Sequence, residues 1–395
     1  MEDKKNYSKP NYDLLAALPE NYRKTALWEM YRESIISDPK IAEEFLSSVK
    51  LSEIGEESKE AASNLLKGIR NSFPEEFEDN LRYNDEGIVL YEEPYLVVGK
   101  TDLYKDEAGE EWVLFFSVIP MMFEIEDRDD SLESHLNDLN SRSIIGAWVN
   151  LYNEEENTDN IALLSGFTMK RRHWTRDSDL YASNLMLQSL AYVTEVQSET
   201  KTIGKAESQQ KIWNIEYENS NQKTSAELIT KSLSDYKNKL RKELQIALTI
   251  EPVDKGYVIK VPLKGHIRHA MAELYIIEYE NNVMGKGMLL GACLPGMLGK
   301  TSSIKMANRL NFDMDQEETI HTTPKLAGAW HASQMEDDSE WYNLYYNSFI
   351  PFNEPSNFSR FMHIEGLVRE VTTSWPKVDT EIQFNSIVRE GSENV

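Results

Sequence analysis

The chain has 395 residues, of which 40% are hydrophobic and 10% aromatic, so it is long enough for two or three domains and too apolar to be disordered. Its 67 acidic and 42 basic residues give a formal net charge of −25, which repels nucleic-acid phosphates and anionic lipid headgroups. The composition therefore argues against direct binding to nucleic acid or to a membrane surface. The same charge is also typical of a surface that only keeps a protein soluble.

The single cysteine, Cys293, lies in an apolar run and has no second thiol with which to form an internal disulfide. This cysteine usage is typical of a reducing compartment, and Cys293 is expected to be a buried core residue rather than a nucleophile. The first residues, MEDKKNYSKPNYD, are polar, and no run in the chain reaches the roughly 18 apolar residues of a membrane span. The expected location is the cytoplasm.

The first half of the chain predicts helices around a group of strands. Residues 1–55 are expected to form a helical extension, broken at Asp38-Pro39, and residues 58–73 a further helix. β-Branched and aromatic runs from Gly87 to Pro120 then predict about three strands. The periodicities that follow predict a short amphipathic helix, two strands and a closing helix, at 131–140, 144–153, 160–169 and 178–197.

The second half predicts the same order again, after a polar linker at 198–221. It begins with a helix at 224–248 and ends in a tail at 376–395. Between these the pattern predicts three strands, a short helix, two strands and a closing helix, at 256–263, 272–280, 287–295, 303–311, 325–333, 341–352 and 359–375.

Residue matches between the halves support a tandem duplication. Gly-Ala-Trp occurs in each half, and each tryptophan is followed 19 positions later by a phenylalanine; we assign these aromatic residues to two cores. Further matches fall in the same order along both halves. The matched pairs are Pro120 with Pro295, Met122 with Met297, Leu139-Asn140 with Leu310-Asn311, Trp148 with Trp330, Phe167 with Phe349, and Glu195-Val196 with Glu370-Val371.

The predicted fold class is therefore α+β, with two tandem α-β-β-β-α-β-β-α units. The units span residues 56–197 and 222–375, and each is expected to be an antiparallel sheet with helices packed on it. The second copy carries an insert at 312–327, before its Gly-Ala-Trp.

The segment LPGMLGKTSS, residues 294–303, looks like the phosphate-binding loop of a nucleotide-dependent enzyme. That loop needs a glycine five positions before the glycine of its Gly-Lys pair, where this chain has Leu294. We therefore interpret Gly296 and Gly299 as turn residues that lead into a helix. A nucleotide contact at Lys300 and Thr301 is the alternative.

No constellation in the sequence predicts catalysis, a metal site or a cofactor. His266 and His269 have the spacing of helical metal ligands, but they lie between predicted strands without a suitably placed carboxylate, which favours a surface turn. Acidic runs at 124–130, 154–159 and 336–340 carry little catalytic information in so acidic a chain.

The segment MKRRHWTR, residues 169–176, locally reverses the sign of the charge and is the best candidate site. In one interpretation the loop docks against the acidic surface of its own chain. In the other it recognises an acidic partner peptide or a phosphate group, with arginines as bidentate donors and a tryptophan as apolar anchor. The predicted partner-binding residues are Lys170, Arg171, Arg172, Trp174 and Arg176.

The element order resembles the type III secretion chaperone-like fold, particularly the YbjN group of bacterial proteins. The residues that carry the resemblance lie on the two short middle helices, Leu136-Asn137-Asp138-Leu139-Asn140 and Ala307-Asn308-Arg309-Leu310-Asn311. The resemblance covers each predicted unit once. It implies a small acidic α+β protein, often a dimer, that binds an extended partner segment and has no active site. Two copies in one chain would form a covalent pseudo-dimer, and the whole chain would be either a monomer or a homodimer.

The favoured function is therefore a non-catalytic adaptor or chaperone-like protein that holds a partner protein's segment in a groove or on a sheet edge. One alternative is an acidic decoy that mimics nucleic acid, which requires the three acidic runs to line one face. Another is a nucleotide-dependent enzyme that uses residues 294–303.

Overall fold

The computed structural model describes residues 56–83, 87–92, 95–105, 109–120, 131–150, 161–200, 248–253, 256–281, 285–312, 327–335, 340–351 and 357–392, which fall into two compact units. Several predictions lie outside these residues. They are the N-terminal extension, the linker beyond residue 200, almost all of the helix at 224–248, the acidic runs apart from Glu340, and most of the insert at 312–327.

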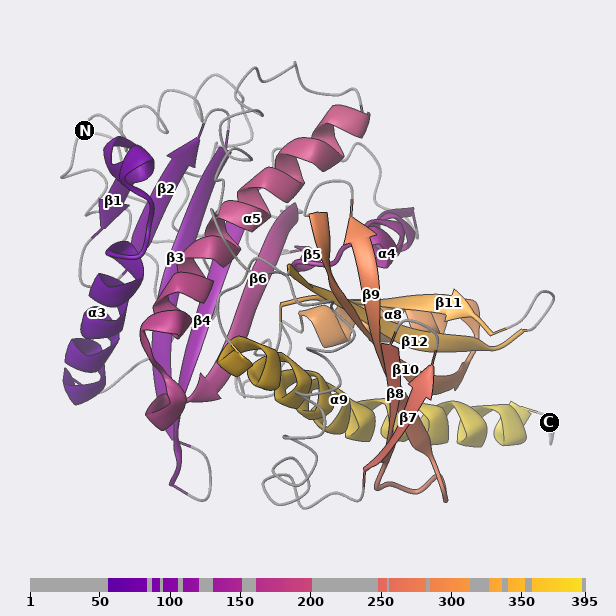
Figure 1. The fold of residues 1–395 in the computed structure, drawn as a ribbon. Helices are drawn as coiled ribbons and strands as arrows, with labels where there is room; N and C mark the ends of the chain where they lie inside the picture. Colours follow the sequence, from indigo (N-terminus) through magenta and orange to yellow (C-terminus); the bar gives the residue numbers. More distant parts are fainter. Residues whose placement is uncertain are drawn as a thin grey trace. The chain divides into compact units, whose positions relative to one another are not determined.

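Six antiparallel strands form the sheet of the first unit, in the order β1-β2-β3-β4-β6-β5 (Figure 1). The strands are β1 (Leu81–Tyr83), β2 (Ile88–Glu92), β3 (Tyr95–Lys105), β4 (Glu111–Pro120), β5 (Ala147–Asn150) and β6 (Ile161–Lys170). Most of their side chains are buried on both faces of the sheet, which explains why the sequence reads as nearly continuous apolar runs rather than as alternation.

Two helices, α3 (Glu56–Arg70) and α5 (Arg176–Thr200), cover one face of this sheet (Figure 1). The Thr101 hydroxyl donates a hydrogen bond to the Ala62 carbonyl oxygen over 3.2 Å, which ties β3 to α3. Gly99 leaves room for Met186 of α5, because a Cβ there would lie 2.6 Å from the Met186 sulfur. Two 3-10 turns, η1 (Glu75–Asn80) and η2 (Arg171–His173), complete the described part of the unit.

The sheet of the second unit has the same topology, in the order β11-β12-β10-β9-β8-β7. Its strands are β7 (Thr249–Val253), β8 (Gly256–Pro262), β9 (Met271–Asn281), β10 (Gly285–Leu298), β11 (Ala329–Gln334) and β12 (Tyr342–Pro351). When the strands of each half are counted in chain order, both sheets follow the order 1-2-3-4-6-5. The fold is thus α+β with two tandem units, as the sequence predicts, and each sheet has six strands.

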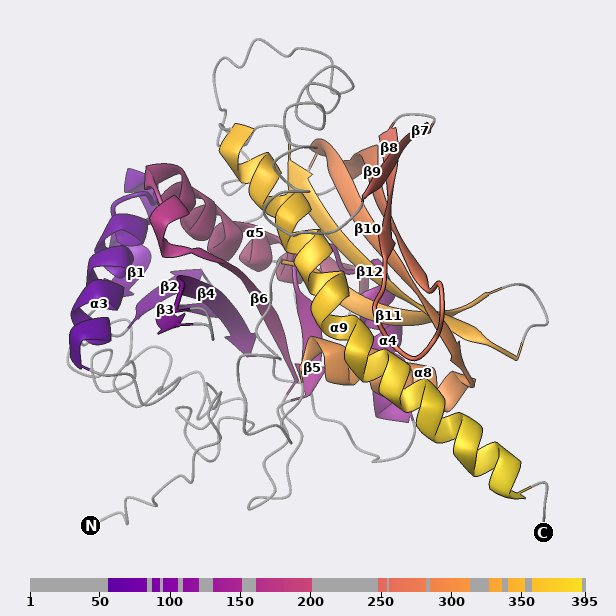
Figure 2. The same ribbon diagram turned by 90° about the horizontal axis from the view of Figure 1, so that it is seen from below.

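Helices α8 (Lys300–Asn311) and α9 (Asn357–Ser392) pack on the sheet of the second unit, and Figure 2 shows α9 running along it. Trp330 and Trp375 are 1% exposed and belong to its core. The ring nitrogen of Trp330 donates a hydrogen bond to the buried Glu370 carboxylate of α9 over 2.9 Å. The second Gly-Ala-Trp therefore joins the edge strand to the closing helix.

The aromatic residues matched between the halves lie at equivalent places. Trp148 and Trp330 are the second residues of β5 and β11, and Phe167 and Phe349 are buried in β6 and β12. The proline match is one residue out of register. In the first sheet Pro120 pairs with Ala162, five positions before Phe167. In the second sheet the residue that pairs five positions before Phe349 is Leu294, which precedes Pro295.

The structure differs from the sequence-based description in the strand number. Each unit begins with a further short strand, β1 or β7, so that it has four strands before the middle helix instead of three. β1 has only three residues and β7 contains Pro252, so neither shows the alternation by which strands are recognised in a sequence.

Two expected boundaries also differ. Helix α9 continues past residue 375 to Ser392, across Pro376, because Trp375, Val378 and Ile382 on both sides of the proline are buried in the core. Helix α4 (Ser131–Arg142) belongs to the first copy by sequence but groups with the second unit, where it packs against β11 and α8. The first unit therefore does not include α4.

Asparagines on the two middle helices bind the backbone of β11, the edge strand. The Asn311 side chain accepts a hydrogen bond from the Trp330 N–H over 2.7 Å and donates one to the Trp330 carbonyl oxygen over 2.8 Å. Asn137 of α4 binds Ala332 in the same way, over 2.7 and 3.1 Å. Edge strands expose unpaired backbone groups, and here one asparagine from each middle helix occupies them, although Asn137 and Asn311 are not matched positions.

Candidate functional site

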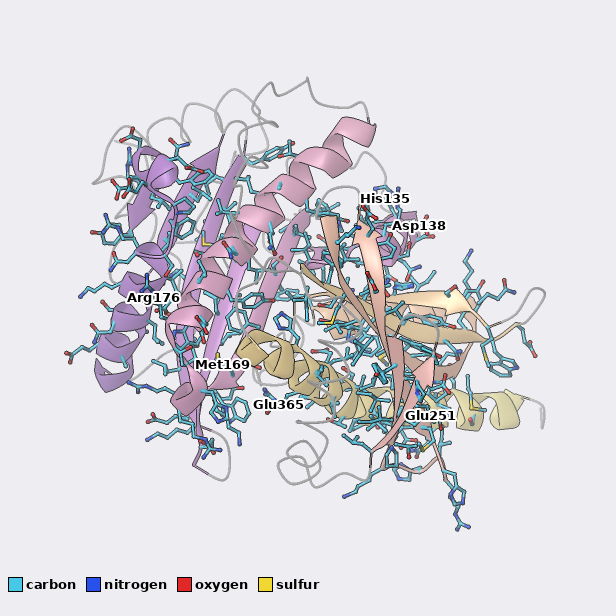
Figure 3. All side chains as sticks on the ribbon, viewed as in Figure 1. His135, Asp138, Met169, Arg176, Glu251 and Glu365 are labelled. Carbon is cyan, nitrogen blue, oxygen red and sulfur yellow. The ribbon has the colours of Figure 1, made fainter. Side chains whose placement is uncertain are left out.

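The basic loop lies between β6 and α5 of the first unit, and Met169 and Arg176, labelled in Figure 3, mark its two ends. Lys170 is the last residue of β6. Its ammonium group lies 3.5 Å from a carboxylate oxygen of Glu110 and 5.5 Å from the centroid of the Trp112 ring. The first cation of the loop is thus held by residues at the start of β4.

The two arginines of η2 form ion pairs with the same acidic end of the β3–β4 hairpin. Arg171 lies 3.3 Å from Glu111, and Arg172 lies 3.3 Å from Glu110. Their side chains remain 43% and 58% exposed, and ion pairs this accessible to water contribute roughly 0–1 kcal/mol. The geometry corresponds to the first interpretation of the sequence, in which the loop docks on its own chain.

Trp174 is fixed inside the unit instead of projecting as an anchor. Its ring stacks on that of Phe167, with centroids 5.7 Å apart and planes 11° from parallel, and its ring nitrogen donates a hydrogen bond to Asp179 over 2.7 Å. Burial raises the pKa of Asp179, and the hydrogen bond from Trp174 only partly opposes this effect. Arg176, the first residue of α5, is exposed and forms no ion pair within the described residues.

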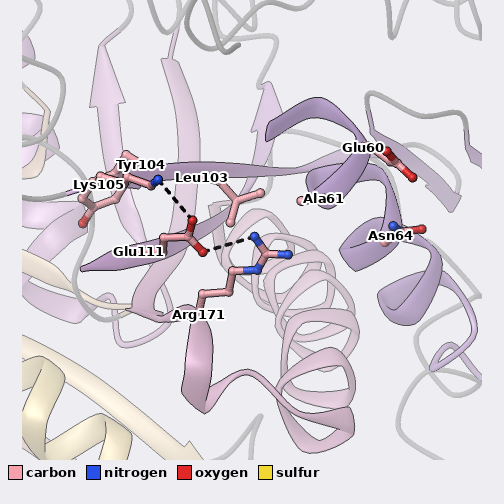
Figure 4. A pocket seen from close by; sticks show the side chains of 8 residues that line it. All are labelled: Glu60, Ala61, Asn64, Leu103, Tyr104, Lys105, Glu111 and Arg171. Carbon is pink, nitrogen blue, oxygen red and sulfur yellow. Dashed lines mark hydrogen bonds and ion pairs between the residues drawn. The ribbon is translucent and has the colours of Figure 1, made fainter. Parts of the chain in front are cut away.

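A cavity of about 560 Å³ lies beside this loop, between α3 and the β3–β4 hairpin (Figure 4). The eight lining residues carry two carboxylates, two cations, an amide and an aromatic ring. They are Glu60, Ala61, Asn64, Leu103, Tyr104, Lys105, Glu111 and Arg171. Glu111 joins two of them, because its carboxylate pairs with Arg171 over 3.3 Å and with Lys105 over 3.5 Å.

Arg171 is the predicted site residue that lines this cavity, whereas Lys170, Arg172, Trp174 and Arg176 do not. Glu60 and Asn64 of α3 face the loop from more than 100 positions away in the chain, and nothing in the sequence pointed to them. Nothing in the sequence placed Glu110 or Glu111 beside the basic loop.

The segment that looks like a phosphate-binding loop continues β10 and begins α8. The pairing of β10 with β12 is irregular between Leu294 and Leu298, and a Cβ on Gly296 would collide with the Tyr342 carbonyl oxygen. The Gly296 N–H donates to the Asn343 side chain over 3.2 Å, and Gly299 is the N-cap residue of α8. Both glycines thus have structural roles in the strand and the helix start.

Cys293 of β10 is only partly buried, whereas the sequence predicts a buried core residue. Burial raises the pKa of Cys293 to about 11, with a smaller opposing effect from its hydrogen bond with Tyr345. A thiol with so high a pKa is a poor nucleophile. Among the described residues no group of three or more His, Cys, Asp and Glu side chains could hold a metal ion.

Comparisons with known proteins give no family for the chain: no family model matches it, and neither the curated proteins nor the solved structures include a match. Within the described part of the chain, no helix is both long enough and apolar enough to cross a membrane.

Proposed function

We propose that this chain is a non-catalytic protein-binding protein that holds a segment of a partner in the cavity beside the basic loop. The observation that carries the proposal is the cavity itself, which is lined by Arg171 of the loop on one side and by residues of α3 on the other. Its volume of about 560 Å³ lies within the range of pockets that enclose a ligand.

The lining chemistry favours an extended, charged segment as ligand. Asn64 offers an amide that can donate and accept, as the backbone of a peptide requires, while Lys105 and Arg171 offer cations to acidic side chains. The carboxylates and cations among the eight lining residues suit ion pairs and hydrogen bonds with a partner segment.

The ion pair of Arg171 supports an exchange mechanism. Because Arg171 and Glu111 are both more than 40% exposed, their pair contributes little and can be replaced at little cost. A partner carboxylate would accept two parallel hydrogen bonds from the guanidinium, which is the geometry that arginine favours. Trp174, held by Phe167 and Asp179, keeps the loop in place while this exchange occurs.

A groove is favoured over a sheet edge as the binding mode. Asn137 and Asn311 already occupy backbone groups of β11, the edge strand at one side of the second sheet. The opposite edge strand, β7, has five residues and contains Pro252, which has no N–H to offer. The resemblance to the chaperone-like YbjN group remains part of this proposal.

The test is a photo-reactive benzophenone amino acid placed in the cavity of the full chain in its native host. Placed at Asn64, which lines the cavity, it should form a covalent adduct with a partner protein. Placed at Lys67, which is exposed on the same helix but does not line the cavity, it should form none. Arg171→Glu should reduce the adduct at position 64 about tenfold, because it replaces the cation with a negative charge that repels an acidic partner segment.

Equal adducts from positions 64 and 67 would overturn the proposal, as would an adduct that Arg171→Glu leaves unchanged. The absence of any protein adduct at position 64 would also count against it.

A further inference from the structure

A second basic surface lies in the other unit, on the loop between β8 and β9. Residues 263–270, LKGHIRHA, contain one lysine, one arginine and two histidines and no acidic residue, in a chain with a net charge of −25. Lys264, His266, Arg268 and His269 are all exposed. From the sequence, only the two histidines of this loop drew notice, as part of a surface turn.

The two ends of this loop are joined by a backbone hydrogen bond and anchored in the core. The Leu263 N–H donates a hydrogen bond to the Ala270 carbonyl oxygen over 2.9 Å, and both side chains are buried. Between them Ile267 is partly buried and packs against the core of the unit. The loop therefore has a fixed position, although most of its side chains lie in solvent.

Asp379 of α9 holds the tip of the loop. Its carboxylate, which is buried, accepts hydrogen bonds from the His266 N–H over 2.8 Å, from the Ile267 N–H over 3.1 Å and from the His266 ring nitrogen Nδ1 over 2.9 Å. Burial would raise the pKa of Asp379, but these hydrogen bonds outweigh it and lower the pKa. The charged carboxylate of Asp379 thus fixes the orientation of the loop.

Two backbone features fit this close contact. A Cβ on Gly265 would lie 2.6 Å from a carboxylate oxygen of Asp379, so a larger residue would push the loop away. His269 has a φ of 62°, in the left-handed region that residues with side chains seldom adopt. Such a conformation persists where surrounding contacts over-determine it, and it is common at ligand-binding loops.

Lys264 and Arg268 of this loop differ in their surroundings from the cations of the basic loop in the first unit. Lys170, Arg171 and Arg172 all pair with glutamates of the β3–β4 hairpin. Lys264 and Arg268 form no ion pair or hydrogen bond within the described residues. We propose that the loop at 263–270 is a binding surface for acidic peptide segments, with Lys264 and Arg268 as its charged contacts.

An acidic peptide suits this surface better than a nucleic acid does. The chain's charge of −25 repels a long polyanion as a whole, whereas a short acidic segment carries few charges and feels mainly the local cations. Arg268 can bind a carboxylate through two parallel hydrogen bonds, and the exposed Nε2 side of His266 adds a further polar group. The proposal rests on the second unit alone and is independent of the cavity in the first.

The test is fluorescence polarisation of a labelled oligoglutamate peptide with the full chain at low salt. The Lys264→Gln/Arg268→Gln variant should bind the peptide about tenfold more weakly. Lys300→Gln/Lys305→Gln, which makes the same charge change at exposed residues of α8, should change the affinity by less than about twofold.

Asp379→Asn separates a positioned loop from general charge attraction. It removes a negative charge and keeps both cations, so charge alone predicts tighter binding, whereas a loop held by Asp379 predicts weaker binding. Tighter binding by Asp379→Asn would overturn the proposal, and so would equal weakening by the two double variants. Failure of the native chain to bind the peptide, or preferential binding of single-stranded RNA of equal charge, would also reject it.

Discussion

Gly68 of α3 and Asp179 of α5 show how single residues position the basic loop. A Cβ on Gly68 would lie 2.5 Å from a carboxylate oxygen of Asp179, the residue that receives the Trp174 hydrogen bond. The absence of a side chain at position 68 therefore lets α3 and α5 approach while Asp179 holds Trp174. A glycine within a helix costs about 1 kcal/mol relative to alanine, which this contact offsets.

Gly68→Ala should lower the free energy of unfolding by about 1 kcal/mol, because displacement of Asp179 outweighs the gain in helix propensity. In an Asp179→Ala background the sign should reverse, and the same change should stabilise the protein by up to about 1 kcal/mol. Urea unfolding of the four proteins of this cycle measures both effects. A stabilising Gly68→Ala in the native background would mean that the contact imposes no strain.

His331 of β11 gives the second unit a dependence on pH. Its side chain is 9% exposed and stacks on Tyr345, with ring centroids 5.7 Å apart, and burial lowers its pKa to about 4. The unfolded chain, with a histidine pKa near 6.5, binds this proton more tightly than the folded chain does. The stability linked to His331 is therefore complete above about pH 6.5 and is lost as the pH falls toward 4.

Between about pH 6.5 and 4, the native chain should lose about 3 kcal/mol more stability than a His331→Gln variant, from the 2.5-unit difference in pKa. Urea unfolding of both proteins across this range isolates the effect, since all carboxylates are common to the two. Parallel stability curves would contradict the assignment of a neutral buried histidine.

At the scale of elements, the middle helices protect an edge strand. Asn311 of α8 and Asn137 of α4 each make two hydrogen bonds to the backbone of β11, and both asparagines are buried. One asparagine from the middle-helix segment of each copy thus acts on the same strand. The sequence singled out these segments but could not assign their role, because the Asn137 contact spans 195 residues.

Asn137→Ala and Asn311→Ala should each lower the free energy of unfolding by about 2 kcal/mol, because each leaves a buried N–H and carbonyl without a partner. Amide hydrogen exchange should accelerate selectively, at Ala332 in the first variant and at Trp330 in the second. Asn385→Ala, whose side-chain bonds stay within α9, is the control and should leave both amides unchanged. Unaltered exchange at Ala332 in Asn137→Ala would contradict the role of α4 in the second unit.

Strand prediction succeeded where apolar runs were long and failed where they were short. The runs at β3, β4, β9 and β10 were recognisable from composition. The short strands β1 and β7 were not, because their stability comes from pairing with β2 and β8 rather than from a pattern of their own. Likewise α9 crosses Pro376, since burial of its apolar residues outweighs the local preference to end the helix.

At the scale of the whole chain, the duplication was predictable and the division into units was not. The repeated Gly-Ala-Trp and its phenylalanine locate equivalent strands in two sheets of the same order. The grouping of α4 with the second unit depends on tertiary contacts, which residue matches do not contain.

The candidate site was predictable only in part, because the sequence shows where basic residues cluster but not which acidic residues pair with them. The sequence identified the basic loop by its contrast with an acidic chain, and the structure places Glu110 and Glu111 against it. The second basic loop, at 263–270, was less conspicuous because glycine and isoleucine separate its charges. Ion pairing within the folded chain therefore decides which cations are available to a partner.

We propose above all that the cavity of the first unit holds a segment of a partner protein. Mass spectrometry of the adduct formed by the benzophenone amino acid at position 64 tests this best, because it identifies the partner residues attached. We expect attachment within one contiguous, acidic segment of a partner protein. Attachment scattered over many unrelated proteins, or to a nucleic acid or a small metabolite, would contradict it.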